Sequence, residues 1–320
     1  MAEHTKIEWA DSTWNPWEGC TKISDACDNC YAADRAKRFG TVEWGNHPRR
    51  RLSDANWRKP RKWNREAEKS GKPHFVFCAS LADVFDNQVP TEWRRELWEL
   101  IDATPHLTWL LLTKRPQNIA RMLPNPGQHY PRGGPAWGDG WPNVWLGTTV
   151  EHQEAADRNI PALLAVPAAR RFLSCEPLLG PVDLSNICTG HYFLNVLNGN
   201  KWHDGPGINK FERGDGSGGG IDWVIAGGES GPNARPSHPD WFRSLRDQCA
   251  AAGTPFLFKQ WGEWRPQSGY RTCDQTRDQV ADDPTYRGFD PARYAEMQRV
   301  GKARAGRFLD GVQHDGRPEA

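Results

Sequence analysis

The sequence has no long apolar run. Its longest strand-like apolar stretch, 109–112, is far below the roughly 18 to 20 residues that a helix needs to cross a bilayer. The N-terminal residues also lack the apolar core of a secretory signal and the Arg- and Ser-rich amphipathic pattern of a transit peptide. These absences predict a soluble, cytoplasmic protein with no membrane partner.

The sequence also has a formal net charge of only +1 and no internal repeat. Its 41 Lys and Arg face 40 Asp and Glu, so bulk charge indicates neither a nucleic-acid binder nor a binder of acidic substrates. Eight cysteines in a reducing compartment are not expected to form a disulfide framework. The 320 residues suffice for one large α/β domain or two ordinary ones.

From residue 74 onward, short apolar runs alternate with helical patterns. The runs begin at residues 74, 108, 144, 171, 222 and 255, and a βαβ unit needs about 30 residues. Thr91 can cap one helix, and residues 238–252 form another that Gly253 ends. Because the runs are apolar at consecutive positions, they indicate parallel strands that are covered on both faces. We therefore expect a parallel α/β architecture and a single domain over 1–320.

Three segments break this rhythm. Residues 124–142 are rich in Gly and Pro, residues 185–220 end in GDGSGGG, and residues 267–306 are polar and charged. We expect all three to be loops or insertions on the rim of the fold.

Polar residues follow each apolar run, where the predicted strand ends. The carboxyl ends of parallel strands meet at one edge of a sheet, which is where the sites of barrels and open α/β sheets lie. The alternative is that these residues are helix caps and turns. The residues are Ser80, Asp83, Lys114, Arg115, Glu151, Ser174, Glu176, Gly227, Gly228, Glu229, Ser230, Lys259 and Gln260.

Three cysteines crowd one short stretch. Cys20, Cys27 and Cys30 form a C-x6-C-x2-C arrangement, which can hold three irons of a [4Fe-4S] cluster and leave the fourth iron open. An open iron can bind a substrate or cofactor, which favours catalysis over electron carriage. The spacing equally allows a structural zinc. The fourth zinc ligand would then be His4, His47 or Cys78.

Sequence blocks along the chain resemble a known family. The blocks WNPWEGC at 14–20, the cysteine loop, LTKRP at 112–116, NVWLG at 143–147, RFLSCEPLL at 171–179, WVIAGGESG at 223–231 and FKQWG at 258–262 are similar to the phage Gp37/Gp68 family, a radical-SAM-like group. The likeness runs in order from about residue 5 to 311. It departs from the commonest radical-SAM spacing in having six residues, not three, between the first two cysteines.

The resemblance implies a partial TIM-like (β/α) barrel of the radical SAM type with rim insertions. It also implies a [4Fe-4S] cluster on the three cysteines, S-adenosylmethionine (SAM) as cofactor and an electron donor such as flavodoxin or ferredoxin. The enzyme would cleave SAM reductively and remove hydrogen from a substrate. We expect the SAM contacts among Ser80, Asp83, Glu151, Ser174, Glu176, Gly227, Gly228, Glu229 and Ser230.

Fixed positive charge at the same edge suits an anionic substrate. Its candidate contacts are Lys114, Arg115, Arg235, Lys259 and Gln260. The alternative is that these groups pair with Glu176 and Glu229 across the barrel.

The balanced total charge hides a basic segment. Residues 35–65 hold eleven Lys and Arg against two acids, with Trp57 and Trp63 interleaved, which is a composition suited to tracking a phosphate backbone and stacking bases. This composition predicts a nucleic acid or nucleotide as the substrate, and the predicted contacts are Arg49, Arg50, Arg51, Arg58, Lys59, Arg61 and Lys62. The alternative is that this basic segment is an ordinary solvated face. The competing function is a non-enzymatic, zinc-containing nucleic-acid-binding module.

Overall fold

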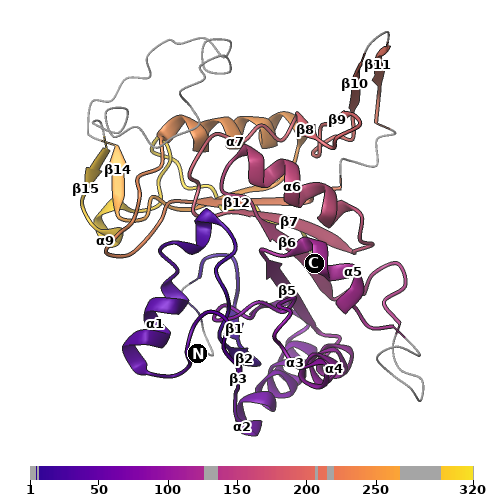
Figure 1. The fold of residues 1–320 in the computed structure, drawn as a ribbon, viewed down its shortest axis with the longest axis vertical. Helices are drawn as coiled ribbons and strands as arrows, with labels where there is room; N and C mark the ends of the chain where they lie inside the picture. The colour runs from indigo at the N-terminus through magenta and orange to yellow at the C-terminus, as the bar shows by residue number, and fades with distance from the viewer. Residues whose placement is uncertain are drawn as a thin grey trace.

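A computed structural model describes residues 5, 7–125, 136–205, 208–214, 220–266 and 297–319. Its centre is a curled, half-barrel sheet of seven strands, and every neighbouring pair is parallel (Figure 1). The strands, in order across the sheet, are β1 (Ser12–Trp14), β4 (His74–Cys78), β5 (Leu107–Thr113), β6 (Val144–Thr149), β7 (Arg170–Cys175), β12 (Trp223–Gly227) and β13 (Phe256–Gln260). The predicted parallel α/β architecture is confirmed, and the sheet is consistent with a partial barrel.

Helices pack on one face of this sheet. The strand side chains that point toward the helices, such as Val76, Leu111 and Leu146, form one buried cluster with Leu97 and Leu245 of the helices. The helices that follow successive strands include α4 (Thr91–Asp102), α5 (Ile119–Met122), α6 (Gln153–Leu164) and α7 (Pro239–Ala252). Two predicted helices are therefore confirmed, but the N-cap of α4 is Pro90, and Thr91 is its first helical residue rather than the cap. Gly253 ends α7 in the left-handed conformation, at φ 71°, which glycine adopts without a steric penalty.

Aromatic side chains fill the opposite face of the sheet. Successive residues of a strand point to opposite faces, and the second set forms a separate buried cluster with Trp9. Its strand members are Phe75, Phe77, Leu110, Trp145, Phe172, Trp223, Ile225 and Leu257. The C-terminal segment lies against this face, because Trp223 Nε1 donates to the Gly316 carbonyl at 2.7 Å. Both faces of the sheet are covered, as the uninterrupted apolar runs predicted.

The N-terminal region forms a small subassembly before β4. The short strands β2 (Trp17–Glu18) and β3 (Arg50–Arg51) pair antiparallel. The helices of this region are η1 (Asp25–Cys27), α1 (Tyr31–Phe39), α2 (Asp54–Trp57) and α3 (Lys59–Ser70). In Figure 1, α1, α2 and α3 lie at the lower end of the molecule.

The three irregular segments differ from one another. Within 185–220 lies a four-stranded antiparallel sheet of β8 (Ile187–Cys188), β9 (Phe193–Leu194), β10 (Lys201–Gly205) and β11 (Ile208–Glu212). This insertion is therefore more ordered than a loop. In 124–142, the described Trp137 and Trp141 are buried against Trp98, whereas residues 126–135 lie outside the described residues.

The third segment, 267–306, is described only at its end. There β15 (Met297–Arg299) pairs antiparallel with β14 (Trp264–Pro266), and α9 (Lys302–Ala305) follows. Residues 267–296 lie outside the described residues. Across the described parts of the chain, we find no helix with the length and apolar character needed to cross a membrane.

Candidate active site

The three cysteines lie on a loop at the carboxyl edge of the sheet. This loop follows β1, whose Trp14 lies opposite Cys78 at the end of β4. Cys27 ends η1, and Cys30 is the residue immediately before α1. All three thiols are partly exposed and none is in a disulfide. The sheet therefore presents the cysteine loop at the edge where the predicted polar residues also lie.

Arg115 holds the first cysteine from the end of β5. Its Nη1 donates to Cys20 Sγ at 3.3 Å and to Asp83 Oδ2 at 3.0 Å, and its Nη2 donates to the Thr21 carbonyl at 2.8 Å. Asp83 is buried and also accepts a 2.8 Å bond from Thr113 Oγ1. Burial raises the pKa of the Cys20 thiol to about 11, the Asp83 charge adds to this rise, and Arg115 opposes it. A guanidinium fixed at this sulfur favours the thiolate form.

Glu229 and Arg235 anchor the other side of the loop, beyond the end of β12. The buried Glu229 carboxylate accepts from Arg235 Nη2 at 2.7 Å and from Asn29 Nδ2 at 2.9 Å. Arg235 also donates to Asp28 Oδ2 at 3.0 Å and to the Asp25 carbonyl at 2.8 Å. These bonds tie residues 25–29 to the far part of the sheet. The loop thus spans the edge from β4 and β5 to β12.

A polar layer lies above the aromatic cluster on the same face of the sheet. Thr149 lies opposite Ser174 in the parallel pair of β6 and β7, and both continue the face that carries Trp145 and Phe172. On neighbouring strands, Lys259 Nζ lies 3.0 Å from Glu176 Oε1. A Cβ atom on Gly227 would lie only 2.6 Å from the same oxygen, so glycine makes room for this carboxylate.

Three buried polar atoms at this edge have no hydrogen-bond partner among the described residues. They are Glu151 Oε1, Thr149 Oγ1 and Gln260 Oε1. Glu151 is only 1% exposed and follows the end of β6 by two residues. A buried polar group without a partner costs roughly 1 to 3 kcal/mol, so these three atoms call for an explanation such as a bound water, an ion or a catalytic role. A ligand with ammonium or hydroxyl donors would satisfy them.

The structure gives other predicted cofactor contacts protein partners. Ser80 Oγ accepts from Asn15 Nδ2 at 3.0 Å, and Ser230 Oγ accepts from Gln260 Nε2 at 3.1 Å. A Cβ atom on Gly228 would lie 2.0 Å from the Trp261 carbonyl, so this glycine allows two turns of backbone to pack together. These three residues are thus engaged within the protein, as Asp83 and Glu229 are.

The basic residues predicted to contact the substrate are also engaged within the protein. Arg235 pairs with Glu229 at 2.7 Å and Lys259 pairs with Glu176 at 3.0 Å, which is the ion pairing that the sequence allowed as an alternative. Arg115 instead pairs with Asp83 at 3.0 Å. The backbone N–H of the half-buried Lys114 donates to Asp83 Oδ2 at 3.2 Å. The positive charge at the edge is largely balanced by these acids.

The predicted nucleic-acid residues fall into two groups. Arg49 is buried, pairs with Asp86 at 2.6 Å and donates to Thr21 Oγ1 at 2.8 Å, so it braces the cysteine loop. Arg50 lies 2.5 Å from Glu18, and Arg51 lies 2.6 Å from Glu96. The second group is exposed on and beside α3 and comprises Arg58, Lys59, Arg61 and Lys62.

Several loop-holding residues were absent from the sequence prediction. Asn29 contacts Glu229, Asn15 Oδ1 accepts from Leu81 N at 2.7 Å, and His152 Nε2 lies 3.6 Å from Asp25 Oδ2. Asn15 and Asn29 lie within or beside the cysteine-loop motifs, so closeness in sequence to the cysteines was the one clue to their role. Nothing in the sequence connects His152 with Asp25.

Of the alternative zinc ligands, the two that the structure describes, His47 and Cys78, are not grouped with the cysteines. His47 lies 3.2 Å from Glu43, Cys78 is fully buried, and His4 lies outside the described residues. No three His, Cys, Asp or Glu side chains in the described ranges converge as a metal site. A surface pocket of about 370 Å³, lined in part by Lys72, Pro105 and Asn143, lies at the amino edge of the sheet, away from the cysteine loop.

The fold and this edge define an α/β protein with a curled parallel sheet and a three-cysteine loop at the carboxyl ends of its strands. The chain belongs to the DUF5131 family, described as a protein of unknown function, whose family model matches residues 4–318. It matches no curated protein and no solved structure.

Proposed function

We propose that this protein is a radical SAM enzyme, as its resemblance to the phage Gp37/Gp68 family implies. The observation that carries the proposal is the position of the cysteine loop. Three partly exposed thiols lie on one loop at the carboxyl edge of a parallel sheet. Active sites of parallel α/β barrels lie at this edge, so the loop is where a catalytic cofactor would be held.

The three cysteine thiols match a [4Fe-4S] cluster with one open iron in number and in ligand type. Thiolates are the usual ligands of iron–sulfur clusters, and three of them leave one iron open. Since no three potential ligands converge in the described ranges, the thiols of Cys20, Cys27 and Cys30 must draw together when a cluster binds. A cluster held by these thiols would supply the one-electron reduction of SAM by which radical SAM enzymes remove hydrogen from a substrate.

The buried atoms beside the loop suit the second cofactor. Glu151 Oε1 and Thr149 Oγ1 are buried without partners, and Ser174 lies next to Thr149 across the sheet. A carboxylate can hold the ammonium group of SAM, and hydroxyl groups can hold its carboxylate or ribose. The aromatic cluster lies below these residues on the same face of the sheet.

The remaining polar residues position the loop rather than react. Arg115, through Asp83, fixes the sulfur of Cys20, while Arg235, through Glu229, fixes residues 25–29. Each guanidinium is oriented by a carboxylate that is at most 5% exposed. These contacts hold the loop at the edge of the sheet, where its three thiols would draw together around a cluster.

Metal analysis of protein purified without oxygen tests this proposal. We expect a brown protein with a broad absorption band near about 400 nm, iron and acid-labile sulfide in equal amounts, and about four irons per chain. A colourless protein with one zinc per chain would contradict the proposal. It would support the zinc-containing nucleic-acid-binding module instead.

A further inference from the structure

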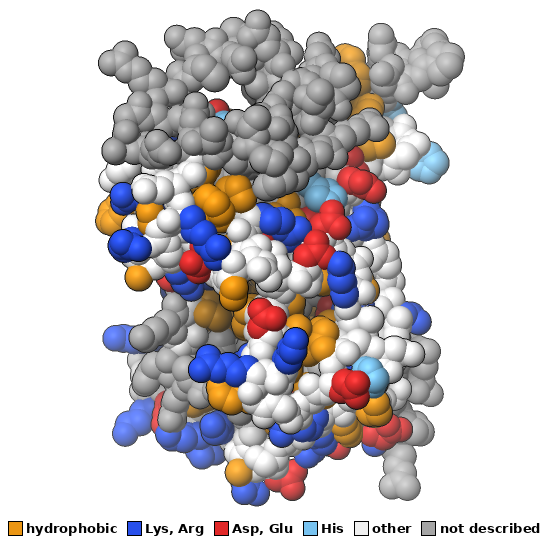
Figure 2. Space-filling view, turned by 60° about the vertical axis from the view of Figure 1, so that its left-hand side comes forward, with side chains coloured by type: hydrophobic (Ala, Val, Ile, Leu, Met, Phe, Trp, Pro, Cys, Tyr) orange, Lys and Arg blue, Asp and Glu red, His pale blue; other side chains and the backbone are white. Residues whose placement is uncertain are grey.

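Positive charge is concentrated at one end of the molecule. Residues 34–72 contain thirteen Lys and Arg against five Asp and Glu, although the whole chain is nearly neutral. These residues include α1, α2 and α3, which lie at the lower end of Figure 1. Lys and Arg side chains gather at the same end in the space-filling view of Figure 2. The fold therefore keeps this charge together rather than spreading it over the surface.

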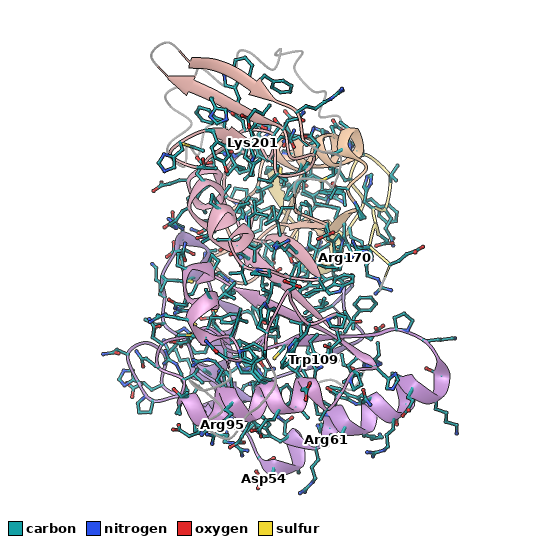
Figure 3. The ribbon with its side chains drawn as sticks, turned by 90° about the vertical axis from the view of Figure 1, so that its right-hand side faces the viewer. Asp54, Arg61, Arg95, Trp109, Arg170 and Lys201 are labelled. Carbon is teal, nitrogen blue, oxygen red and sulfur yellow. The ribbon has the colours of Figure 1, made fainter. Side chains whose placement is uncertain are left out.

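The solvent side of α3 carries a continuous basic stripe. Its cations recur every three or four residues, and at 100° per residue they fall within an arc of about 100°. We call this stripe the α3 basic face; its members are Arg58, Arg61, Lys62, Arg65 and Lys69, all exposed. Figure 3 shows Arg61 on the outside of the molecule, at the end opposite Lys201.

Most cations of the α3 basic face have no acidic partner. Among the described residues, Arg61, Arg65 and Lys69 form no ion pair. Lys62 lies 3.6 Å from Glu66, and the charge of Arg58 contributes to lowering the pKa of Asp54. The neighbouring arginines 49–51 differ, because each pairs with a carboxylate within 2.6 Å. Unneutralised cations held close together repel one another, so a bound polyanion would relieve this repulsion.

The geometry of the stripe matches a phosphate backbone. From residue 58 to residue 69 the helix rises by about 16 Å, at 1.5 Å per residue. One strand of duplex DNA carries a phosphate about every 3.4 Å along its axis, so the stripe covers about five phosphates. Three members are arginines, whose planar guanidinium can bind a phosphate through two hydrogen bonds.

The composition of α3 argues against a membrane or a protein partner. Helices that bind membranes insert apolar side chains, and stable protein interfaces have an apolar or aromatic centre. The apolar residues of α3, Pro60, Trp63 and Ala67, are all buried in the protein. The α3 basic face therefore offers charge without an apolar anchor, which favours nucleic acid.

We infer that the α3 basic face binds the phosphate backbone of a nucleic acid. Trp57 and Trp63 are 9% and 2% exposed, so they belong to the core and stack on no base. Recognition by this face is thus independent of base sequence, since phosphate contacts carry no direct sequence information. This inference rests on the proposed radical SAM function and names nucleic acid as the substrate class of that enzyme.

Charge neutralisation on α3 tests the inference. The test variant is Arg61→Gln/Arg65→Gln/Lys69→Gln, because glutamine removes the charge and preserves helix propensity. Arg213→Gln/Lys302→Gln/Arg304→Gln removes three exposed charges elsewhere and is the matched control. Fluorescence anisotropy of labelled duplex DNA and single-stranded RNA, titrated over a range of salt, gives the affinity and its salt dependence.

We expect the α3 variant to bind duplex DNA on the order of 100-fold more weakly at about 0.1 M salt. The slope of log affinity against log salt concentration should be smaller in magnitude by about three. The control variant should bind like the unmodified protein. Equal effects of the two variants would overturn the inference, as would tighter binding of polyglutamate or anionic phospholipid vesicles than of DNA and RNA. Because binding is measured on the cluster-free full chain, its failure is distinguishable from failure of the proposed function.

Discussion

Replacing Cys27 with alanine is expected to remove nearly all iron from the reconstituted protein. The same result is expected for Cys20 and Cys30, because each loss leaves only two thiolates for a cluster that needs three from this loop. Cys27 and Cys30 are partly exposed, so their substitution opens no core cavity and the fold should persist. Iron and sulfide counts measure the effect, and circular dichroism verifies that the variant is folded.

The exposed Cys188 supplies the matched control for this experiment. Cys188→Ala should retain its full iron content, since Cys188 lies in the inserted antiparallel sheet. Cys78, Cys175 and Cys249 are buried in the hydrophobic core, so they are not available to a cluster on the cysteine loop. Cys273 is also expected to be dispensable and lies outside the described residues. Full iron retention in Cys27→Ala would refute the ligand assignment.

Glu151→Gln is expected to weaken SAM binding by about 10- to 100-fold. A hydrogen bond to a charged group contributes about 1.5 to 3 kcal/mol, and about 1.4 kcal/mol corresponds to a tenfold change in affinity. The free energy of unfolding of the ligand-free chain should stay the same or rise, because the buried Glu151 Oε1 has no partner to lose. Equilibrium dialysis with SAM and urea unfolding measure the two quantities.

The opposite responses of binding and stability separate a ligand contact from a structural role. Glu154→Gln removes an exposed carboxylate three residues away on α6 and should change neither quantity. If Glu151→Gln lowers stability and leaves SAM affinity intact, then Glu151 is a structural residue and the proposed SAM contact is wrong.

Sequence reasoning located most of the central sheet, for a physical reason. Strands buried on both faces are apolar at consecutive positions, so β4, β5, β6, β7, β12 and β13 could all be recognised. The strand β1 has only three residues, Ser12 to Trp14, which is too short for any pattern. Its parallel pairing with β4 is a long-range contact, and such contacts leave no periodic trace in a single sequence.

The placing of these polar residues at one edge of the sheet was predictable, but their pairing with one another was not. Parallel strands bring their carboxyl ends to one edge, which is why the polar residues after each run lie together. Which of them bind one another depends on side-chain direction: Glu229 accepts from Arg235 and Asn29, whereas Glu151 Oε1 has no partner. Composition was equally ambiguous for Arg49, which looked like part of a basic surface but is buried on Asp86.

Product analysis after reduction with SAM is the most direct test of the proposed radical SAM activity. The reconstituted protein is incubated anaerobically with dithionite and SAM, and the products are separated by chromatography. We predict 5′-deoxyadenosine and methionine from the unmodified protein, and neither product from Cys27→Ala treated identically. A fully reconstituted cluster that yields no 5′-deoxyadenosine, with or without nucleic acid present, would contradict the account.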